Sequence, residues 1–226
     1  LQNRLKSIGL RPISSLVDVT NFFTYDNNRP LHVFDAEKIA GRVLRVHRAK
    51  GGEHFHALDE KTYVLSEGMT IISDSNGVES LGGIIGGIQS ACSPETVNVF
   101  LEAAFFDPVT TAYTGRDLKI NSDARYRFER GVDPEWTPYG IDAATRMILD
   151  LCGGTPSQII IAGQIPNYTR SYKLDTGHVN SLVGMPIHPE TQRKTLKDLG
   201  FKLDADMVIV PSWRPDVQGP SDLVEE

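Results

Sequence analysis

Residues 127–134 read Arg-Phe-Glu-Arg-Gly-Val-Asp-Pro, the most distinctive stretch of this 226-residue chain. It alternates charged residues with bulky apolar ones, and its closing Gly and Asp-Pro are typical of a turn. Arg125, Arg127 and Arg130 lie close together here, a density that suits phosphate groups or buried carboxylates. From the charge pattern alone we favour a plainer interpretation, in which this stretch is a strand edge with salt bridges along it.

The composition is that of an ordinary soluble globular protein, with 40% hydrophobic and 23% charged residues. A net charge of -6 disfavours a protein that coats nucleic acid through bulk charge, although local contacts to a structured RNA stay open. No apolar run approaches the roughly 20 residues that span a membrane, so we expect no membrane segment. The first residue is Leu1 and no signal-peptide core follows, so we expect the chain to start inside a longer protein.

The cysteine and histidine residues do not form a metal-binding pattern. Cys92 and Cys152 lack CxxC spacing, and we expect two reduced thiols in a cytoplasmic protein. His47, His54 and His56 have neither cysteines nor an HExxH motif beside them. The alternation of His54-Phe-His56 favours a surface strand, so we predict no metal site.

The periodicity of apolar residues predicts both strands and helices, which makes the fold class α+β. Strands are expected at residues 42–48, 69–73, 97–102 and, as a fully buried strand, 158–162. In the third strand, alternation places Phe100 and Glu102 on one face and Leu101 on the other.

One long helix is expected between Thr137, as its cap, and the pair Gly153-Gly154. The residues at helical spacing that should pack into the core are Ile141, Ala144, Met147, Ile148 and Leu151.

A second, smaller domain is expected after a polar linker at residues 164–171. Helices at 176–183 and 189–199, and then a hairpin of 201–203 with 207–210, predict a small winged-helix-like unit. Such units bind nucleic acid or act as spacers.

The glycine-rich stretch Gly82–Gly87 is the first candidate for ligand binding. Its spacing is not the GxGxxG of dinucleotide-binding loops, and no helix can begin cleanly after it. We therefore favour a structural use, in which the backbone approaches a neighbour closely. This spacing also argues against an unrelated nucleotide-binding enzyme.

Two polar patches and one acidic residue are further candidates. Thr20 and Asn21 supply a hydroxyl and an amide, and His32 supplies an imidazole that titrates near neutrality. A single histidine beside apolar residues is more often part of the core than a catalyst. Glu102 ends an apolar strand and therefore needs a partner, which is either a nearby arginine or a ligand. The residues alone leave both possibilities open, and they show no serine-hydrolase, Walker or kinase motif.

Taken together, the motifs resemble those of the beta subunit of bacterial phenylalanine–tRNA ligase (phenylalanyl-tRNA synthetase). The matching stretches occur in the family's order along nearly the whole chain, and they are residues 17–21, 30–35, 82–87, 101–108, 127–134, 211–216 and 222–226. Each stretch is weak evidence by itself, whereas the set is highly specific.

The resemblance implies a mixed, layered β/α editing domain at residues 1–165 and a small winged-helix-like domain at 172–226. It also implies hydrolysis of tyrosine wrongly attached to the phenylalanine tRNA. The family's aminoacylation site lies in the alpha subunit, its partner in a heterotetramer. ATP and Mg²⁺ therefore belong to the whole enzyme, and no cofactor is expected in this part.

The resemblance also implies roles for individual residues. Glu102 matches the residue by which the family recognises the tyrosine hydroxyl. The other matches are His32, Thr20 and Asn21 around the ester, and Gly83, Ser122 and Ala124 in the pocket. Arg116, Lys119, Arg125 and Arg130 are candidates for RNA contacts, with solvent-facing ion pairs as an equally good alternative.

This sequence departs from the family pattern at two places. Ser122 stands where threonine is common, and Arg125-Tyr126 stands where Ser-His is frequent, which puts a hydrogen-bonding role there in doubt. The main rival interpretation is a non-catalytic RNA-binding or structural module with an inactive pocket.

Overall fold

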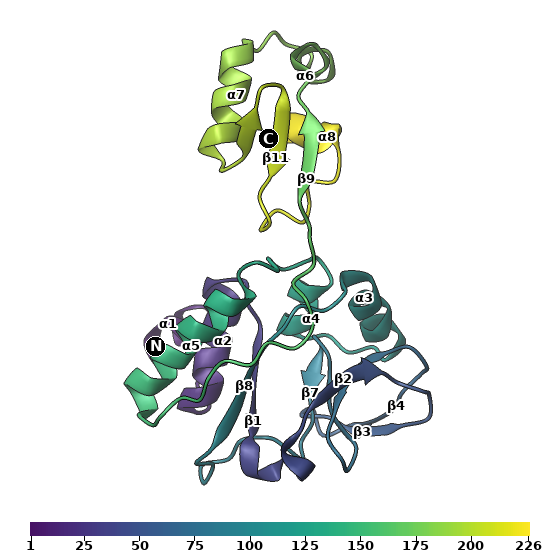
Figure 1. Cartoon of the computed structure of the whole chain (residues 1–226), viewed down its shortest axis with the longest axis vertical. Coiled ribbons are helices and arrows are strands. Elements are labelled where there is room, and N and C mark those ends of the chain that lie inside the picture. Colours follow the sequence, from purple (N-terminus) through teal and green to yellow (C-terminus); the bar gives the residue numbers. More distant parts are fainter. The chain divides into compact units, whose positions relative to one another are not determined.

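The computed structural model describes residues 1–226, and the chain divides into two compact units. The large unit comprises Leu1–Val132 and Trp136–Ala162, and the small unit comprises Asp133–Glu135 and Gly163–Glu226. Both units combine helices with antiparallel sheets, which confirms the predicted α+β class (Figure 1).

Three helices of the large unit begin at a side chain that caps them. Ser14, Asp107 and Ser122 each accept a hydrogen bond from the backbone amide three residues further on, which satisfies a free amide of the first turn. The helices are α1 Gln2–Ser7, α2 Ser15–Asp26, α3 Pro108–Asp117, α4 Asp123–Phe128 and α5 Thr137–Cys152, with 3-10 helices η1 Ala36–Lys38 and η2 Ala40–Arg42.

The strands of the large unit form three antiparallel sheets, of order β1-β8, β2-β5-β6-β7 and β3-β4. Their bounds are β1 Leu31–Asp35, β2 Arg45–Arg48, β3 His54–His56, β4 Thr62–Val64, β5 Thr70–Ser73, β6 Val78–Leu81, β7 Ile85–Gly86 and β8 Val99–Ala103. The strand predicted at 42–48 is shorter than expected, while His54-Phe-His56 forms the predicted surface strand with Phe55 buried.

The two faces of the β1–β8 sheet have different neighbours. Leu31 and Leu101, on one face, pack against Val19 of α2 and Ala144 of α5. Figure 1 shows α2 and α5 side by side next to these strands. The opposite face carries Phe34, which belongs to a separate buried cluster with Phe106 and Phe128. The sheet therefore presents one face to the helices and the other to the interior around the glycine turn, residues 82–84 between β6 and β7.

The stretch 127–134 is not a strand edge. Helix α4 runs to Phe128, and a turn follows in which Gly131 has φ of 96°, a left-handed conformation that favours glycine. The charged residues at helical spacing form i,i+4 pairs, Arg125 with Glu129 and Arg127 with Asp123. The alternation of charge and apolar bulk was misleading because it also fits a short helix with one buried side.

The strand predicted at 158–162 does not form. The isoleucines of this stretch are exposed, at 87% for Ile160, and no other segment pairs with them. A run of β-branched residues favours extended backbone, but a strand also requires a neighbour that takes up its hydrogen bonds.

Helix α5 differs in detail from the prediction. Trp136 occupies the cap position, so Thr137 is the first helical residue and does not cap the helix. The helix ends at Gly153 as expected, with φ of 74°, whereas Leu151 is exposed and lies outside the core stripe.

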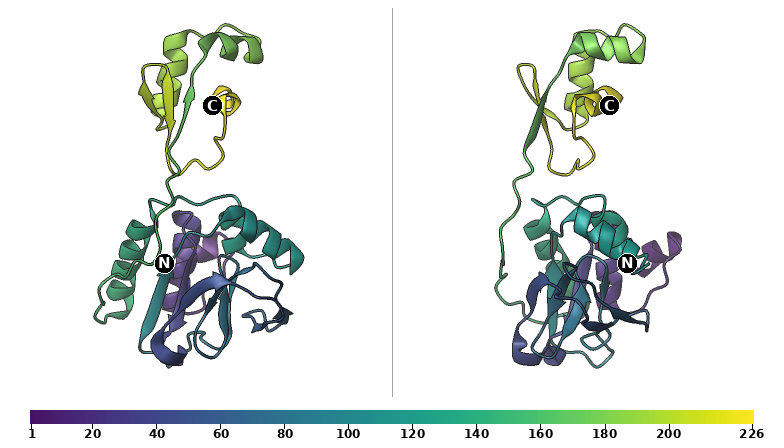
Figure 2. Two further views of the ribbon diagram at one scale, coloured as in Figure 1. Left: turned by 45° about the vertical axis from the view of Figure 1, so that its right-hand side comes forward. Right: turned by 90° about the vertical axis from the view of Figure 1, so that its right-hand side faces the viewer.

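The small unit contains the predicted helices and hairpin, together with two further elements. Its bounds are β9 Arg170–Lys173, α6 Thr176–Val183, α7 Pro189–Asp198, β10 Lys202–Asp204, β11 Met207–Val210 and α8 Pro220–Glu225. Strand β9 begins inside the expected linker and completes a sheet of order β10-β11-β9. Val208 and Val210 point into a core that also contains Leu196 of α7 and Leu223 of α8, and Figure 2 shows these helices against the sheet.

Candidate active site

His32 and Glu102 lie directly opposite each other in the β1–β8 sheet. The antiparallel register pairs His32 with Glu102 and Phe34 with Phe100, so these four side chains share one face. Side chains of directly opposed residues are close neighbours in such a sheet. Two candidates seventy positions apart in sequence are thus brought together by strand pairing.

The imidazole of His32 is held as a neutral ring. It packs edge-on against Phe34, with ring centroids 4.4 Å apart, and its Nε2 atom is buried without a hydrogen-bond partner. Burial lowers the pKa of His32 to about 4, because removal from water disfavours the charged form. At neutral pH the ring is uncharged, with a free nitrogen available to a ligand or water.

The carboxyl group of Glu102 is half-buried and has neither a hydrogen bond nor an ion pair. Burial raises the pKa of Glu102 to about 7, and no neighbouring charge contributes to this shift. The alternative of an ion pair between Glu102 and an arginine is therefore wrong. An unpartnered acidic group of this kind destabilises the free protein and suits a site that awaits a hydrogen-bonding ligand.

The raised pKa of Glu102 predicts a pH-dependent cost to folding. Its ordinary pKa is 4.5, so stability is fully present below pH 4.5 and falls as pH rises to about 7. Above pH 7 the loss is on the order of 2–3 kcal/mol, where the lower figure allows for partial exposure. We expect Glu102→Gln to leave the free energy of unfolding unchanged near pH 4.5 and to raise it by this amount at pH 8. Urea unfolding at both pH values measures the effect, and a pH-independent difference would count against it.

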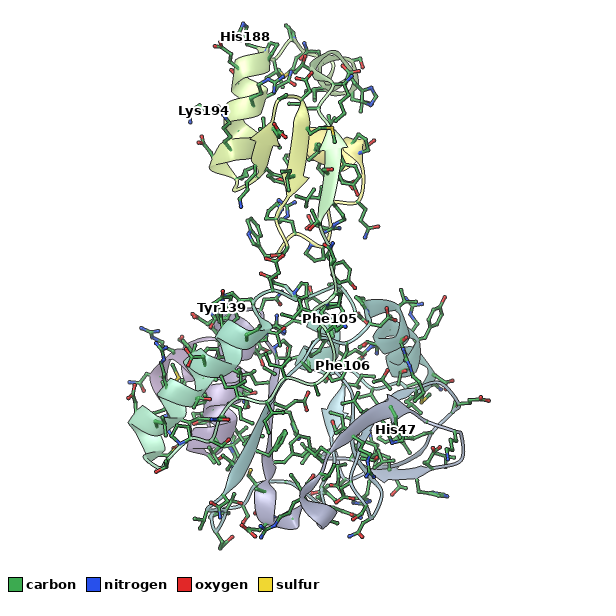
Figure 3. All side chains as sticks on the ribbon, in the orientation of Figure 1. His47, Phe105, Phe106, Tyr139, His188 and Lys194 are labelled. Carbon is green, nitrogen blue, oxygen red and sulfur yellow. The ribbon has the colours of Figure 1, made fainter.

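The glycine-rich stretch is the tight connection between β6 and β7, which confirms close approach of the backbone to its neighbours. A Cβ atom on Gly86 would lie 2.2 Å from Cε1 of His32, so only glycine leaves room for the imidazole. A Cβ atom on Gly83, which has φ of 74°, would lie 2.9 Å from Phe106 and 3.1 Å from Phe128. In the free protein, the aromatic rings closest to Gly83 are therefore those of Phe106 and Phe128. Figure 3 labels Phe106 in this part of the large unit.

The predicted pocket wall, Ser122 and Ala124, is attached to the same turn. The hydroxyl of Ser122 donates to the carbonyl of Ile84, at 2.6 Å, and accepts from the amide of Arg125, at 3.0 Å. Ala124 packs against the cluster that contains Phe106 and Phe128. Ser122 is therefore both the cap of α4 and its link to the glycine turn.

Thr20 and Asn21 lie on helix α2 and are not joined to His32 by any hydrogen bond. The buried hydroxyl of Thr20 donates to the carbonyl of Val17 within its own helix. Asn21 is half-buried and its side-chain amide makes no hydrogen bond. Helix α2 packs against the face of the β1–β8 sheet opposite to His32. The structure therefore brings His32, Glu102 and the glycine turn together, whereas Thr20 and Asn21 lie apart from them.

The four basic candidates differ in their exposure. Arg116 is exposed, and Lys119 is exposed as well, in a left-handed conformation between α3 and α4. Arg130 stacks on the exposed ring of Tyr126, 3.7 Å from its centroid, and pairs with Glu129. Arg125 is only 9% exposed and is bonded within the fold, which removes it from the candidates for RNA contact.

Sequence reasoning missed two kinds of residue at this site. Phe106 and Phe128 lie against Gly83 and share a buried cluster with Phe34, and the aromatic character of these residues was the signal available in the sequence. Gly86 was seen only as one of several glycines.

A pocket of about 370 Å³ lies over the start of α4, lined by Asn121, Ser122, Asp123, Arg125, Tyr126 and Glu129. No group of three or more His, Cys, Asp or Glu side chains is arranged to hold a metal ion, and no helix is long and apolar enough to cross a membrane.

Comparisons with known proteins agree with this organisation. A family model described as the B3/4 domain matches residues 1–153, and one described as the tRNA synthetase B5 domain matches residues 172–226. The phenylalanine–tRNA ligase beta subunits of Ruegeria pomeroyi and Cereibacter sphaeroides are 62% and 59% identical to this chain. Both matches cover 100% of this chain and 28% of the relative, so the chain spans just over a quarter of their length.

A solved N-terminal fragment of the phenylalanyl-tRNA synthetase beta-subunit from Pyrococcus horikoshii is 13% identical, with a TM-score of 0.39 over 93% of this chain and 63% of that one. That likeness is too weak to carry an argument. The two domain models and the end-to-end matches to close relatives place the chain in the family of phenylalanine–tRNA ligase beta subunits, of which it carries a B3/4 domain and a B5 domain.

Proposed function

We propose that the large unit is an editing hydrolase, which releases tyrosine wrongly attached to the phenylalanine tRNA. The observation that supports this most strongly is the pair of His32 and Glu102 on one sheet face. Nε2 of His32 is buried without a hydrogen-bond partner, and burial shifts the pKa of both His32 and Glu102 so that the neutral form of each is favoured. Such perturbed and unpartnered groups are typical of binding and catalytic sites.

Glu102 is proposed to recognise the phenolic hydroxyl of tyrosine. An aminoacylation site shaped for phenylalanine rejects tyrosine incompletely. A second site must therefore bind the additional hydroxyl group favourably. With its pKa at about 7, the Glu102 carboxyl accepts a hydrogen bond from that hydroxyl when ionised and donates one when protonated. With a phenylalanyl ester the carboxyl stays unpaired, at a cost of about 1–3 kcal/mol.

His32 is proposed to orient the attacking water or the ester. A pKa of about 4 makes its imidazole a weak base at neutral pH, although the free Nε2 can accept a hydrogen bond. Backbone amides near Gly83 would stabilise the oxyanion, and the terminal ribose hydroxyl of the tRNA would assist. Because α2 packs on the other face of the β1–β8 sheet, Thr20 and Asn21 are not assigned a contact with the ester. We propose no metal ion and no covalent intermediate.

Replacing His32 with alanine tests this function. We expect about tenfold slower release of tyrosine, below the roughly 10²–10⁴-fold contribution of a true general base. The preference for tyrosine over phenylalanine should be kept, because Glu102 provides it. His47→Ala, an exposed histidine on β2 labelled in Figure 3, is the matched control and should have the wild-type rate. Loss of the preference with hydrolysis intact would contradict the assignment.

The remaining contacts are proposed at the level of the whole enzyme. Arg116, Lys119 and Arg130 are the basic residues we retain as candidates for contacts to the phenylalanine tRNA. The alpha subunit, ATP and Mg²⁺ would belong to the phenylalanine–tRNA ligation that the complete cytoplasmic enzyme performs.

A further inference from the structure

Arg125 is buried beside the pocket over the start of α4, with only 9% of the residue exposed. Its Nη1 lies 3.0 Å from the carbonyl of Gly115, 2.6 Å from that of Ile120 and 3.0 Å from Oδ1 of Asn121. Its Nε donates to Glu129 at 2.9 Å. A single guanidinium group thus holds the end of α3, the α3–α4 loop and the end of α4.

The fold leaves a space for this side chain. A Cβ atom on Gly115 would lie 2.2 Å from Nε of Arg125, so a glycine within α3 provides room for the guanidinium. The carbonyls near the C-terminus of α3 carry partial negative charge, which the cation stabilises. Lys119 in the same loop has φ of 55°, a conformation that costs energy for a residue other than glycine. The contacts from Arg125 hold the loop in this form.

From these contacts we propose that Arg125 is a positioning residue that fixes the wall formed by Ser122 and Ala124, and thereby sets how well the pocket distinguishes tyrosine from phenylalanine. This inference rests on the proposed editing function. Arg125 does not touch the substrate in this account, and it acts through the loop that it holds.

A short series of contacts joins Arg125 to the site. Asn121 and Ile120, which accept from Arg125, immediately precede Ser122. The Ser122 hydroxyl donates to the carbonyl of Ile84, which lies two residues before Gly86, the neighbour of His32. Movement of the loop would therefore shift the pocket wall and the glycine turn together, and misplacement of about 1 Å lowers rates by roughly 100-fold.

Arg125→Lys is the sharpest test, because lysine keeps the charge but lacks the planar fork that reaches several acceptors at once. Arg146→Lys is the matched control, since Arg146 on α5 is exposed, pairs with Asp142 four residues before it and has no proposed role at the site. For each variant we would measure the melting temperature, kcat and KM with tyrosyl- and phenylalanyl-tRNA(Phe), and hydrogen exchange of the amides of residues 118–122.

We expect Arg125→Lys to speed exchange in this loop and to lower the tyrosine-to-phenylalanine ratio of kcat/KM on the order of tenfold. Arg146→Lys should leave both unchanged. If the lysine variant does not fold, Asn121→Ala, which removes one acceptor, should give a smaller change in the same direction.

Faster exchange with an unchanged ratio would overturn the proposal, because Arg125 would then be a purely structural residue. Unchanged exchange would overturn it as well, since the loop would not depend on the arginine. If the unaltered protein hydrolyses neither ester, the editing function fails, and the exchange measurement still shows whether Arg125 holds the loop.

Discussion

Replacing Glu102 with alanine is expected to abolish the preference for tyrosyl-tRNA. The hydrogen bond from a phenol to a buried carboxylate contributes about 1.5–3 kcal/mol, so kcat/KM for the tyrosyl ester should fall roughly 10- to 150-fold. The phenylalanyl ester should be hydrolysed at nearly its original rate, because it leaves Glu102 unpaired in the unaltered protein.

Deacylation rates of the two aminoacyl-tRNAs, measured side by side, check this expectation. The phenylalanyl ester is the internal control for folding and for catalysis, and a melting curve confirms that the variant is folded. An equal fall for both esters would assign Glu102 to catalysis rather than to recognition. Glu102→Gln should retain part of the preference, since an amide also hydrogen-bonds to a phenol.

Replacing Gly86 with alanine is expected to slow hydrolysis of both esters on the order of 100-fold. The added Cβ would lie 2.2 Å from Cε1 and 2.6 Å from Nε2 of His32, distances at which one group must move. The imidazole packs against Phe34, so the ring and the β7 backbone would both shift. Because His32 and Glu102 are cross-strand neighbours, the disturbance would reach the carboxyl group also.

Gly77→Ala is the matched control for that change. Gly77 precedes β6 in the same sheet, and an added Cβ there would have no atom within 4 Å. Its melting temperature and rates should match those of the unaltered protein. A Gly86→Ala protein with a wild-type rate would show that the position of His32 does not matter for hydrolysis.

The sequence predicted the local elements of this fold better than their pairing. The helix up to Gly153 and the small-unit helices were readable from periodicity and caps. The run 158–162 was assigned to a strand from composition, yet a strand exists only where a partner is present. The same limitation applies to β1, whose pairing with β8 over about seventy residues leaves no local signal.

At the candidate site, too, the sequence indicated individual residues but not which of them lie together. His32, Glu102 and Gly83 were selected by their motifs, but only the strand register shows that His32 and Glu102 are neighbours. The glycines indicated a close approach without revealing that His32 and Phe106 are the groups approached. Arg125 was considered as a surface cation because nothing in the sequence shows that Gly115 and Ile120 surround it. The capping position of Ser122 before α4 could have been recognised from the sequence alone.

Selective hydrolysis of tyrosyl-tRNA(Phe) by the large unit can be measured directly. The most direct measurement is the release of tyrosine and of phenylalanine from the same tRNA, with the 226-residue chain and with the complete two-subunit enzyme, at neutral pH. Tyrosine should be released at least tenfold faster than phenylalanine, about the contribution of one such hydrogen bond. Equal release of the two amino acids, or no release by the complete enzyme, would contradict the proposed editing function.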